Sequence, residues 1–129
     1  MTKKHFQITL LGPRMAICRL DPDAELPAWA ECRLFSASTR TDEELSIVCP
    51  EVAVPGQVFC QKGWRCLKIE GPLDLTEIGV LHALARPLAE AKISIFALST
   101  YNTDYLLVKE KDLDRAMEAL TQEGHRFIE

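Results

Sequence analysis

The most constraining feature of this sequence is the order of elements that its residue pattern predicts from Gly63 to Glu129. Residues 64–70 alternate apolar and polar side chains, which predicts a half-buried strand that ends at Gly71 and Pro72. A helix should follow, with Pro87 kinking or dividing it because proline removes a backbone donor. The apolar residues at helical spacing that should form its buried face are Ile78, Leu81, Leu84, Leu88 and Ala91.

A hairpin, a second helix and a last strand should complete this half. Residues 93–100 and 105–108 are rich in strand-forming residues and are separated by a polar turn. Asp112 can cap a helix that ends near Gly124, and residues 126–128 offer a short strand. The buried face of this helix should consist of Leu113, Ala116, Met117 and Leu120. The resulting βαββαβ order predicts an α+β, ferredoxin-like fold with both helices on one face of an antiparallel sheet.

The first half of the chain is less regular but echoes the second. The pattern of residues 35–51 parallels that of residues 96–110, and both read as two strands joined by a polar turn. The other candidates are strands at 6–11 and 15–20 and a short helix around 24–30. We therefore expect two ferredoxin-like subdomains in tandem, with a degenerate copy in residues 1–62 and a better preserved copy in residues 63–129.

Composition restricts the functional class. The 129 residues are 47% hydrophobic and 26% charged, which is typical of a soluble globular protein with a core. The net charge of -4 argues against nucleic acid and anionic membranes as partners. Lys3 and Lys4, the only adjacent basic residues, are most simply interpreted as solvated ends. No apolar run reaches the roughly 18 residues of a membrane span, and no signal peptide is visible. Five cysteines without C-x-x-C spacing favour a reducing, cytoplasmic location.

The topology predicts where a ligand could bind. The loop 71–80 and the turn 99–104 should meet at one sheet edge, which would bring Asp74, Glu77, Thr100 and Asp104 near a helix N-terminus. Carboxylates beside free N–H groups suit a zwitterion such as an amino acid, and Gly79 would allow its close approach. The alternative is structural: Asp74 and Thr76 could be plain helix caps, Asp104 a turn former and Gly79 a packing glycine.

Three stretches around this candidate site carry a family resemblance. They are Gly71–Leu75, Glu77–Leu81, and Ile93–Tyr101 with Thr103–Tyr105. They resemble the ACT domains of the CASTOR-type arginine sensors and their small bacterial relatives and, more distantly, those of aspartate kinase regulatory domains. The resemblance covers residues 63–125, and the first half only as a degenerate ACT-like copy.

The resemblance implies a homodimer with an amino-acid pocket between two ACT domains. The pocket residues that it implies are Glu77, Gly79, Val80, Thr100 and Asp104. Tyr105 departs from the pattern, and a second full pair of ACT copies is missing, so arginine itself is not implied.

The resulting hypothesis is a non-catalytic amino-acid sensor that regulates a partner protein. An enzyme is disfavoured because no phosphate loop, oxyanion donor set or cofactor fingerprint accompanies the carboxylates, and no cofactor is expected. The scattered His5, His82 and His125 argue against a metal site. The remaining alternative is a protein-interaction module without a ligand, anchored by aromatic residues such as Trp29, Trp64 or Tyr101.

Overall fold

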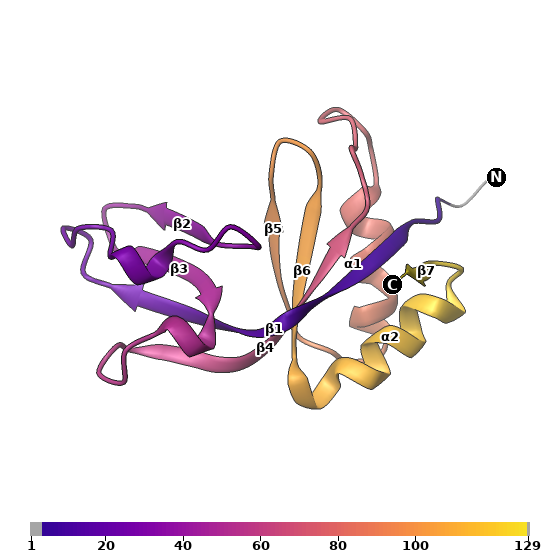
Figure 1. The fold of residues 1–129 in the computed structure, drawn as a ribbon. Coiled ribbons are helices and arrows are strands. Elements are labelled where there is room, and N and C mark those ends of the chain that lie inside the picture. Colours follow the sequence, from indigo (N-terminus) through magenta and orange to yellow (C-terminus); the bar gives the residue numbers. More distant parts are fainter. Residues whose placement is uncertain (1–3, 129) are drawn as a thin grey trace. The chain divides into compact units, whose positions relative to one another are not determined.

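The computed structural model describes residues 4–128, which form two compact units (Figure 1). The helical unit joins the described residues through Gly12 to those from Arg65 onward, and the strand unit is Pro13–Trp64. Lys3 of the basic pair and the outermost residues of both expected subdomains lie outside the described part. The strands are β1 (Gln7–Leu20), β2 (Ala37–Arg40), β3 (Leu45–Pro50), β4 (Cys60–Ile69), β5 (Ile95–Ser99), β6 (Asp104–Lys109) and β7 (Arg126–Ile128). The helices are α1 (Val80–Glu90) and α2 (Leu113–Gln122), with 3-10 turns η1 (Ala28–Ala30), η2 (Glu51–Ala53) and η3 (Glu110–Asp112).

The helical unit contains the βαββαβ order that the sequence predicts, running from β4 through α1, β5, β6 and α2 to β7. β5 and β6 form the expected antiparallel hairpin, in which Ser99 pairs with Asp104 next to the turn. The strand order is β5-β6-β4-β1, and β7 pairs with β1 in parallel at residues Gln7–Thr9. The first part of β1 therefore lies between β4 and β7, which the pattern of the second half alone could not show.

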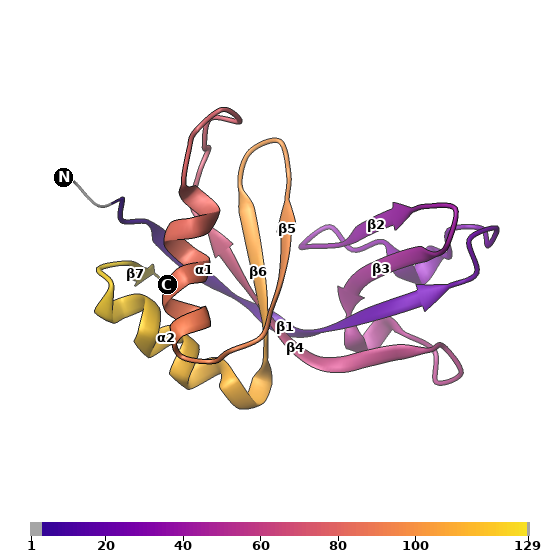
Figure 2. The ribbon, with the colours of Figure 1, turned by 180° about the vertical axis from the view of Figure 1, so that it is seen from behind.

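Both helices of this unit pack on the same face of its sheet, as expected. α1 and α2 lie side by side (Figures 1 and 2). Their buried side chains share one core with alternate residues of β4 and β6. The fully buried members from the two strands and α1 are Leu67, Ile69, Leu106, Val108, Leu84 and Leu88. α2 adds the predicted residues Leu113, Ala116 and Leu120, with Met117 partly buried.

Two residues of the predicted buried face of α1 are exposed instead. Ile78 is 86% exposed because the helix begins only at Val80, and Leu81 is 42% exposed. α1 is not divided at Pro87, which lies inside the helix with its ring buried. At the end of α2, Gly124 adopts the predicted left-handed conformation, with φ of 99°.

A buried histidine replaces the backbone bond that Pro87 removes. Because Pro87 has no N–H, the Ala83 carbonyl loses its usual helical donor four residues later. The His125 Nε2 atom lies 3.3 Å from that carbonyl oxygen, and the Nδ1 atom accepts the Phe6 N–H at 3.1 Å. Nδ1 must be unprotonated to accept, so Nε2 carries the proton and donates to Ala83. His125 thus joins α1 to the start of β1.

We expect the protein to lose stability as the pH falls below about 6.5, the ordinary histidine pKa. Burial lowers the pKa of His125, so the unfolded chain binds a proton at a higher pH than the folded chain. The stabilisation that the neutral His125 ring contributes is complete above about pH 6.5. It is lost as the pH falls toward the lower pKa that His125 has in the folded state. Urea unfolding at pH 7.5 and 5.5 measures this loss.

A matched pair of variants isolates the residue responsible for this pH dependence. His125→Gln should be less stable than the parent at pH 7.5 but should show a smaller decline on acidification. His82→Gln, which changes an exposed histidine, should keep the decline. An equal decline in the parent and in His125→Gln would contradict the assignment.

The strand unit repeats the sheet of the helical unit without its helices. Its strand order is β2-β3-β1-β4, matching β5-β6-β4-β1. The predicted helix around residues 24–30 is only the single turn η1, and η2 stands in the place of the second helix. β1 and β4 each contribute one part to each unit, so the compact units divide at Gly12/Pro13 and Trp64/Arg65, whereas the sequence placed the boundary at 61–63.

Candidate functional site

A pocket of about 360 Å³ lies in the helical unit, between the loop that follows β4 and the β5–β6 turn. Its volume falls in the range of small-molecule sites. All six residues that the sequence nominated line it, from both segments. They are Asp74, Glu77, Gly79, Val80, Thr100 and Asp104. The structure thus brings together residues up to 30 positions apart, as the convergence of the loop and the turn predicts.

One backbone bond and one side-chain bond hold the loop and the end of β4 against the turn. The Leu73 N–H donates to the Asn102 carbonyl oxygen at 2.7 Å. The buried Thr103 hydroxyl donates to the Ile69 carbonyl oxygen at 2.6 Å, which ties the turn to the end of β4. A side chain at Gly71 would place its Cβ 2.9 Å from the Asn102 oxygen, so only glycine permits this approach. The shape of the pocket therefore depends on hydrogen bonds made by residues of its own lining, Leu73, Asn102 and Thr103.

The helix end that faces the pocket has no side-chain cap. Gly79 occupies the N-cap position with φ of 83°, in the left-handed region that favours glycine. The interpretation of Gly79 as a packing glycine is wrong, because a Cβ at Gly79 would meet nothing within 4 Å. The first intrahelical bond runs from the Ala83 N–H to the Gly79 oxygen, at 2.9 Å. The preceding N–H groups of the first turn, from Val80 to His82, have no intrahelical acceptor and can meet an anion.

Asp74 shapes the loop instead of capping the helix. Its carboxylate accepts the Thr76 N–H at 2.9 Å and the Thr76 hydroxyl at 2.7 Å. These bonds lower the pKa of Asp74, so the group is ionised at neutral pH. The interpretation of Asp74 and Thr76 as helix caps is therefore wrong, since α1 begins four residues after Thr76.

The two other carboxylates differ in their partners. Asp104 accepts the Ser99 hydroxyl at 2.5 Å across the hairpin. Glu77 accepts the ammonium of Lys4 at 3.0 Å, and the same ammonium donates to the Ile78 carbonyl oxygen at 2.8 Å. Sequence reasoning missed Lys4 because it treated the adjacent lysines as solvated ends. No local pattern links residues 73 positions apart.

Apolar side chains surround this pocket. In the described part of the helical unit, the large apolar side chains that are strongly exposed all belong to its loop, its helix start or its turn. They are Leu75 (65% exposed), Ile78 (86%), Leu81 (42%) and Tyr101 (80%). We call these four residues the apolar rim. Such a group of exposed apolar side chains around a pocket is typical of a surface that another molecule covers.

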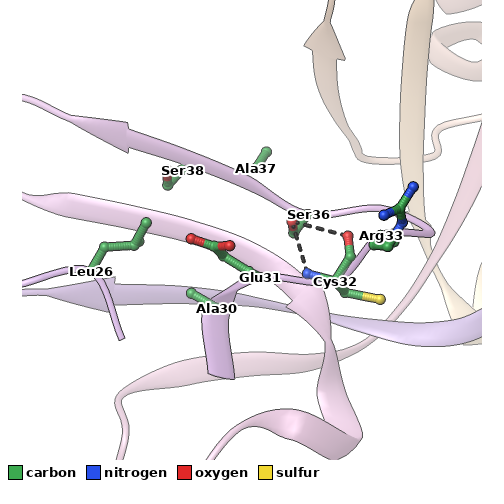
Figure 3. Close-up of a pocket in the computed structure, with 8 residues that line it drawn as sticks. All are labelled: Leu26, Ala30, Glu31, Cys32, Arg33, Ser36, Ala37 and Ser38. Atoms are coloured by element: carbon green, nitrogen blue, oxygen red, sulfur yellow. Dashed lines mark hydrogen bonds between the residues drawn. The ribbon is translucent and has the colours of Figure 1, made fainter. Parts of the chain in front are cut away.

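The strand unit holds a larger hollow of about 570 Å³ (Figure 3). The Ser36 hydroxyl accepts the Cys32 N–H at 3.1 Å and donates to the Cys32 carbonyl oxygen at 3.2 Å, which closes the loop that forms one wall. The charged side chains of Glu31 and Arg33 do not converge on a common point (Figure 3). None of the nominated residues lines this hollow. We therefore regard the pocket of the helical unit as the candidate site.

The described residues form no metal-ligand group, and burial makes two of their thiols weakly reactive. Within residues 4–128, no three His, Cys, Asp or Glu side chains are grouped as metal ligands. Burial raises the pKa of the Cys18 and Cys66 thiols to about 12, so both are protonated and weakly nucleophilic at neutral pH. In the same part of the chain, no helix has the length and apolar content of a bilayer span.

Two family models match parts of this chain. A family model described as an ACT domain matches residues 59–122, and a second, described as an N-terminal domain, matches residues 14–57. The mouse cytosolic arginine sensor for mTORC1 subunit 1 is 32% identical over 114 residues, which cover 81% of this chain and 34% of the sensor. The chain therefore spans about a third of the length of the curated relatives that it matches first.

Two solved structures show how widely the fold is shared. The crystal structure of a protein from Agobacterium tumefaciens is 36% identical, with a TM-score of 0.92, and the match covers 98% of this chain and 94% of that protein. The ligand-free regulatory subunit of aspartate kinase from Thermus thermophilus has a TM-score of 0.63 at 10% identity, with 91% and 97% of the two chains covered. The second likeness shows a common fold alone.

Proposed function

This chain belongs to the ACT domain family, and we propose that it is a non-catalytic sensor that binds a free amino acid. The observation that carries the proposal is the pocket of the helical unit. It combines the open N-terminus of α1 with the carboxylate of Asp104, and it lies where the two segments resembling the family's ligand-binding loops meet. The similarity to curated arginine sensors supports the same class of ligand.

The pocket can satisfy both charged ends of an amino acid. In our proposal, the ligand's carboxylate accepts N–H groups of the first turn of α1, where the helix dipole also favours a negative charge. Its ammonium meets Asp104 or Glu77 through charge-assisted hydrogen bonds. Gly79 leaves open space beside the backbone, and Val80 and Thr100 line the remaining wall.

We further propose that the sensor acts as a homodimer in the cytoplasm, with the ligand at an ACT–ACT interface. The apolar rim supports this proposal, because a second copy that covered it would enclose the ligand and supply the opposite wall. Binding would then regulate a partner protein.

A second candidate function is a protein-interaction module without a ligand. The exposed Tyr101 and Leu75 favour it, because aromatic and aliphatic side chains on a surface commonly anchor a protein partner. Trp64 does not contribute an anchor, since it is only 6% exposed. The two candidates differ in whether a free amino acid changes the protein.

A thermal-shift panel of the twenty common amino acids separates these functions. A ligand that binds only the folded state stabilises it by about 2.7 kcal/mol at a hundredfold excess over its dissociation constant, which is a shift of several degrees for a chain of this size. Light scattering of the intact chain, with and without the best amino acid, then tests the dimer. If no amino acid raises the melting temperature and none binds by calorimetry, the sensor function is refuted.

A further inference from the structure

Lys4 places a positive charge where the candidate site offers acceptors to a cation. Its ammonium contacts one carboxylate oxygen of Glu77 at 3.0 Å and the Ile78 carbonyl oxygen at 2.8 Å. Glu77 lines the pocket, and Ile78 precedes the helix N-cap directly. A charged and a neutral oxygen on adjacent residues form a receptor for an ammonium or guanidinium group.

The strand unit shows the same chemistry at the corresponding place in its own fold. The guanidinium of Arg40 donates to the Ala24 carbonyl oxygen at 2.8 Å and to the Pro22 carbonyl oxygen. These carbonyls lie in the loop after β1, the strand whose place β4 takes in the helical unit. Arg40 is the last residue of β2 before its hairpin turn, as Ser99 is in β5. The loop after β1 in the strand unit and the loop after β4 in the helical unit therefore each bind a cationic side chain of the same protein.

We propose that Lys4 is an internal competitor for the ligand's cationic group, and that binding displaces its ammonium from Glu77 and Ile78. This inference rests on the proposed amino-acid site and adds a mode of regulation to it. The Lys4 side chain is 45% exposed, and ion pairs so exposed contribute up to about 1 kcal/mol, so a ligand can replace this one. Lys4 also lies three residues before β1, so its release frees the segment that leads into this strand.

Lys4→Met tests the displacement, because it removes the charge and keeps most of the side-chain length. In calorimetry of the intact chain with L-arginine, L-lysine and L-glutamine, Lys4→Met should bind up to about fivefold more tightly than the parent. This gain corresponds to the free energy of the ion pair, which the ligand no longer has to break. A gain for all three would assign the receptor to the α-ammonium, and a gain for the two basic amino acids alone would assign it to the side chain. Lys111→Met, which alters an exposed lysine in η3, should leave all three affinities unchanged.

A second readout follows the displaced lysine directly. Acetylation of Lys4 by acetic anhydride, measured by peptide mass spectrometry, should become faster at saturating L-arginine, while the rate at Lys111 stays constant. Unchanged or weaker binding by Lys4→Met, with the parent binding normally, would overturn the displacement and leave the sensor function intact. If neither protein binds any amino acid, the sensor function fails and the competitor role falls with it.

Discussion

Replacement of Asp104 by alanine is expected to weaken binding of the preferred amino acid about tenfold to a hundredfold. A hydrogen bond to a charged group contributes about 1.5–3 kcal/mol, and each 1.4 kcal/mol is a factor of ten in affinity. Without ligand, Glu77 holds the charged Lys4, and Asp74 accepts two bonds from Thr76. Asp104 accepts the neutral Ser99 hydroxyl, so a ligand ammonium can reach this carboxylate without displacing another charge. Isothermal titration calorimetry of the parent and the variant measures the loss.

Two further variants separate the charge of Asp104 from its structural role. Asp104→Asn keeps an oxygen that can accept the Ser99 hydroxyl, so the hairpin should stay intact while affinity falls. Asp114→Ala removes an exposed carboxylate from α2 and should bind like the parent. Parent-like affinity in Asp104→Ala would remove this residue from the site.

The largest effect on folding is expected from Leu84→Ala, which should lower the free energy of unfolding by about 2–5 kcal/mol. Leu84 is fully buried in the core that α1 shares with β4, β6 and α2, so truncation leaves a cavity. Urea unfolding followed by circular dichroism measures the change. Because native domains are stable by only about 5–15 kcal/mol, this single replacement is severe.

Leu81→Ala is the matched control, since it makes the same chemical change in the same helix. Leu81 is 42% exposed and should lose roughly 0.5 kcal/mol or less. Equal losses in the two variants would contradict the observed orientation of α1. The comparison also tests the correction to the sequence-based helix face, in which both leucines were expected to be buried.

The local spacing of apolar residues was sufficient to predict elements that pack against segments close to them in the sequence. The β5–β6 hairpin and the inward face of α2 follow from strand and helix spacing. The start of α1 could not be predicted in this way. Ile78 fits the apolar period, but the N-cap Gly79 has a left-handed backbone and the helix begins only at Val80. Periodicity measures the spacing of apolar residues, but helix boundaries depend on backbone conformation.

Pairings between distant segments were beyond that reasoning. Residues 6–11 and 15–20 read as separate strands because Gly12 and Pro13 interrupt them, yet β1 is continuous. Its pairing with β7 ends at Thr9 and its pairing with β3 begins at Met15, so Pro13 falls between the two ladders. A proline there costs neither ladder a donor.

The candidate site was more predictable than its electrostatics. Topology was sufficient to bring the loop and the turn together, because both lie at one edge of the sheet. Only a three-dimensional structure could reveal that Lys4 neutralises Glu77 or that Thr76 holds Asp74. These partners change which carboxylate a ligand can reach.

The division of β1 and β4 between the two units has a consequence for how this protein can be dissected. A fragment that began at Gly63 would retain the loop and turn of the pocket but would lack the strand that separates β4 from β7. The exposed edge of β4 would then be free to recruit a strand from another molecule. Self-association of such a fragment would reflect strand exchange and not native assembly. The oligomeric state should therefore be measured on the uncut chain.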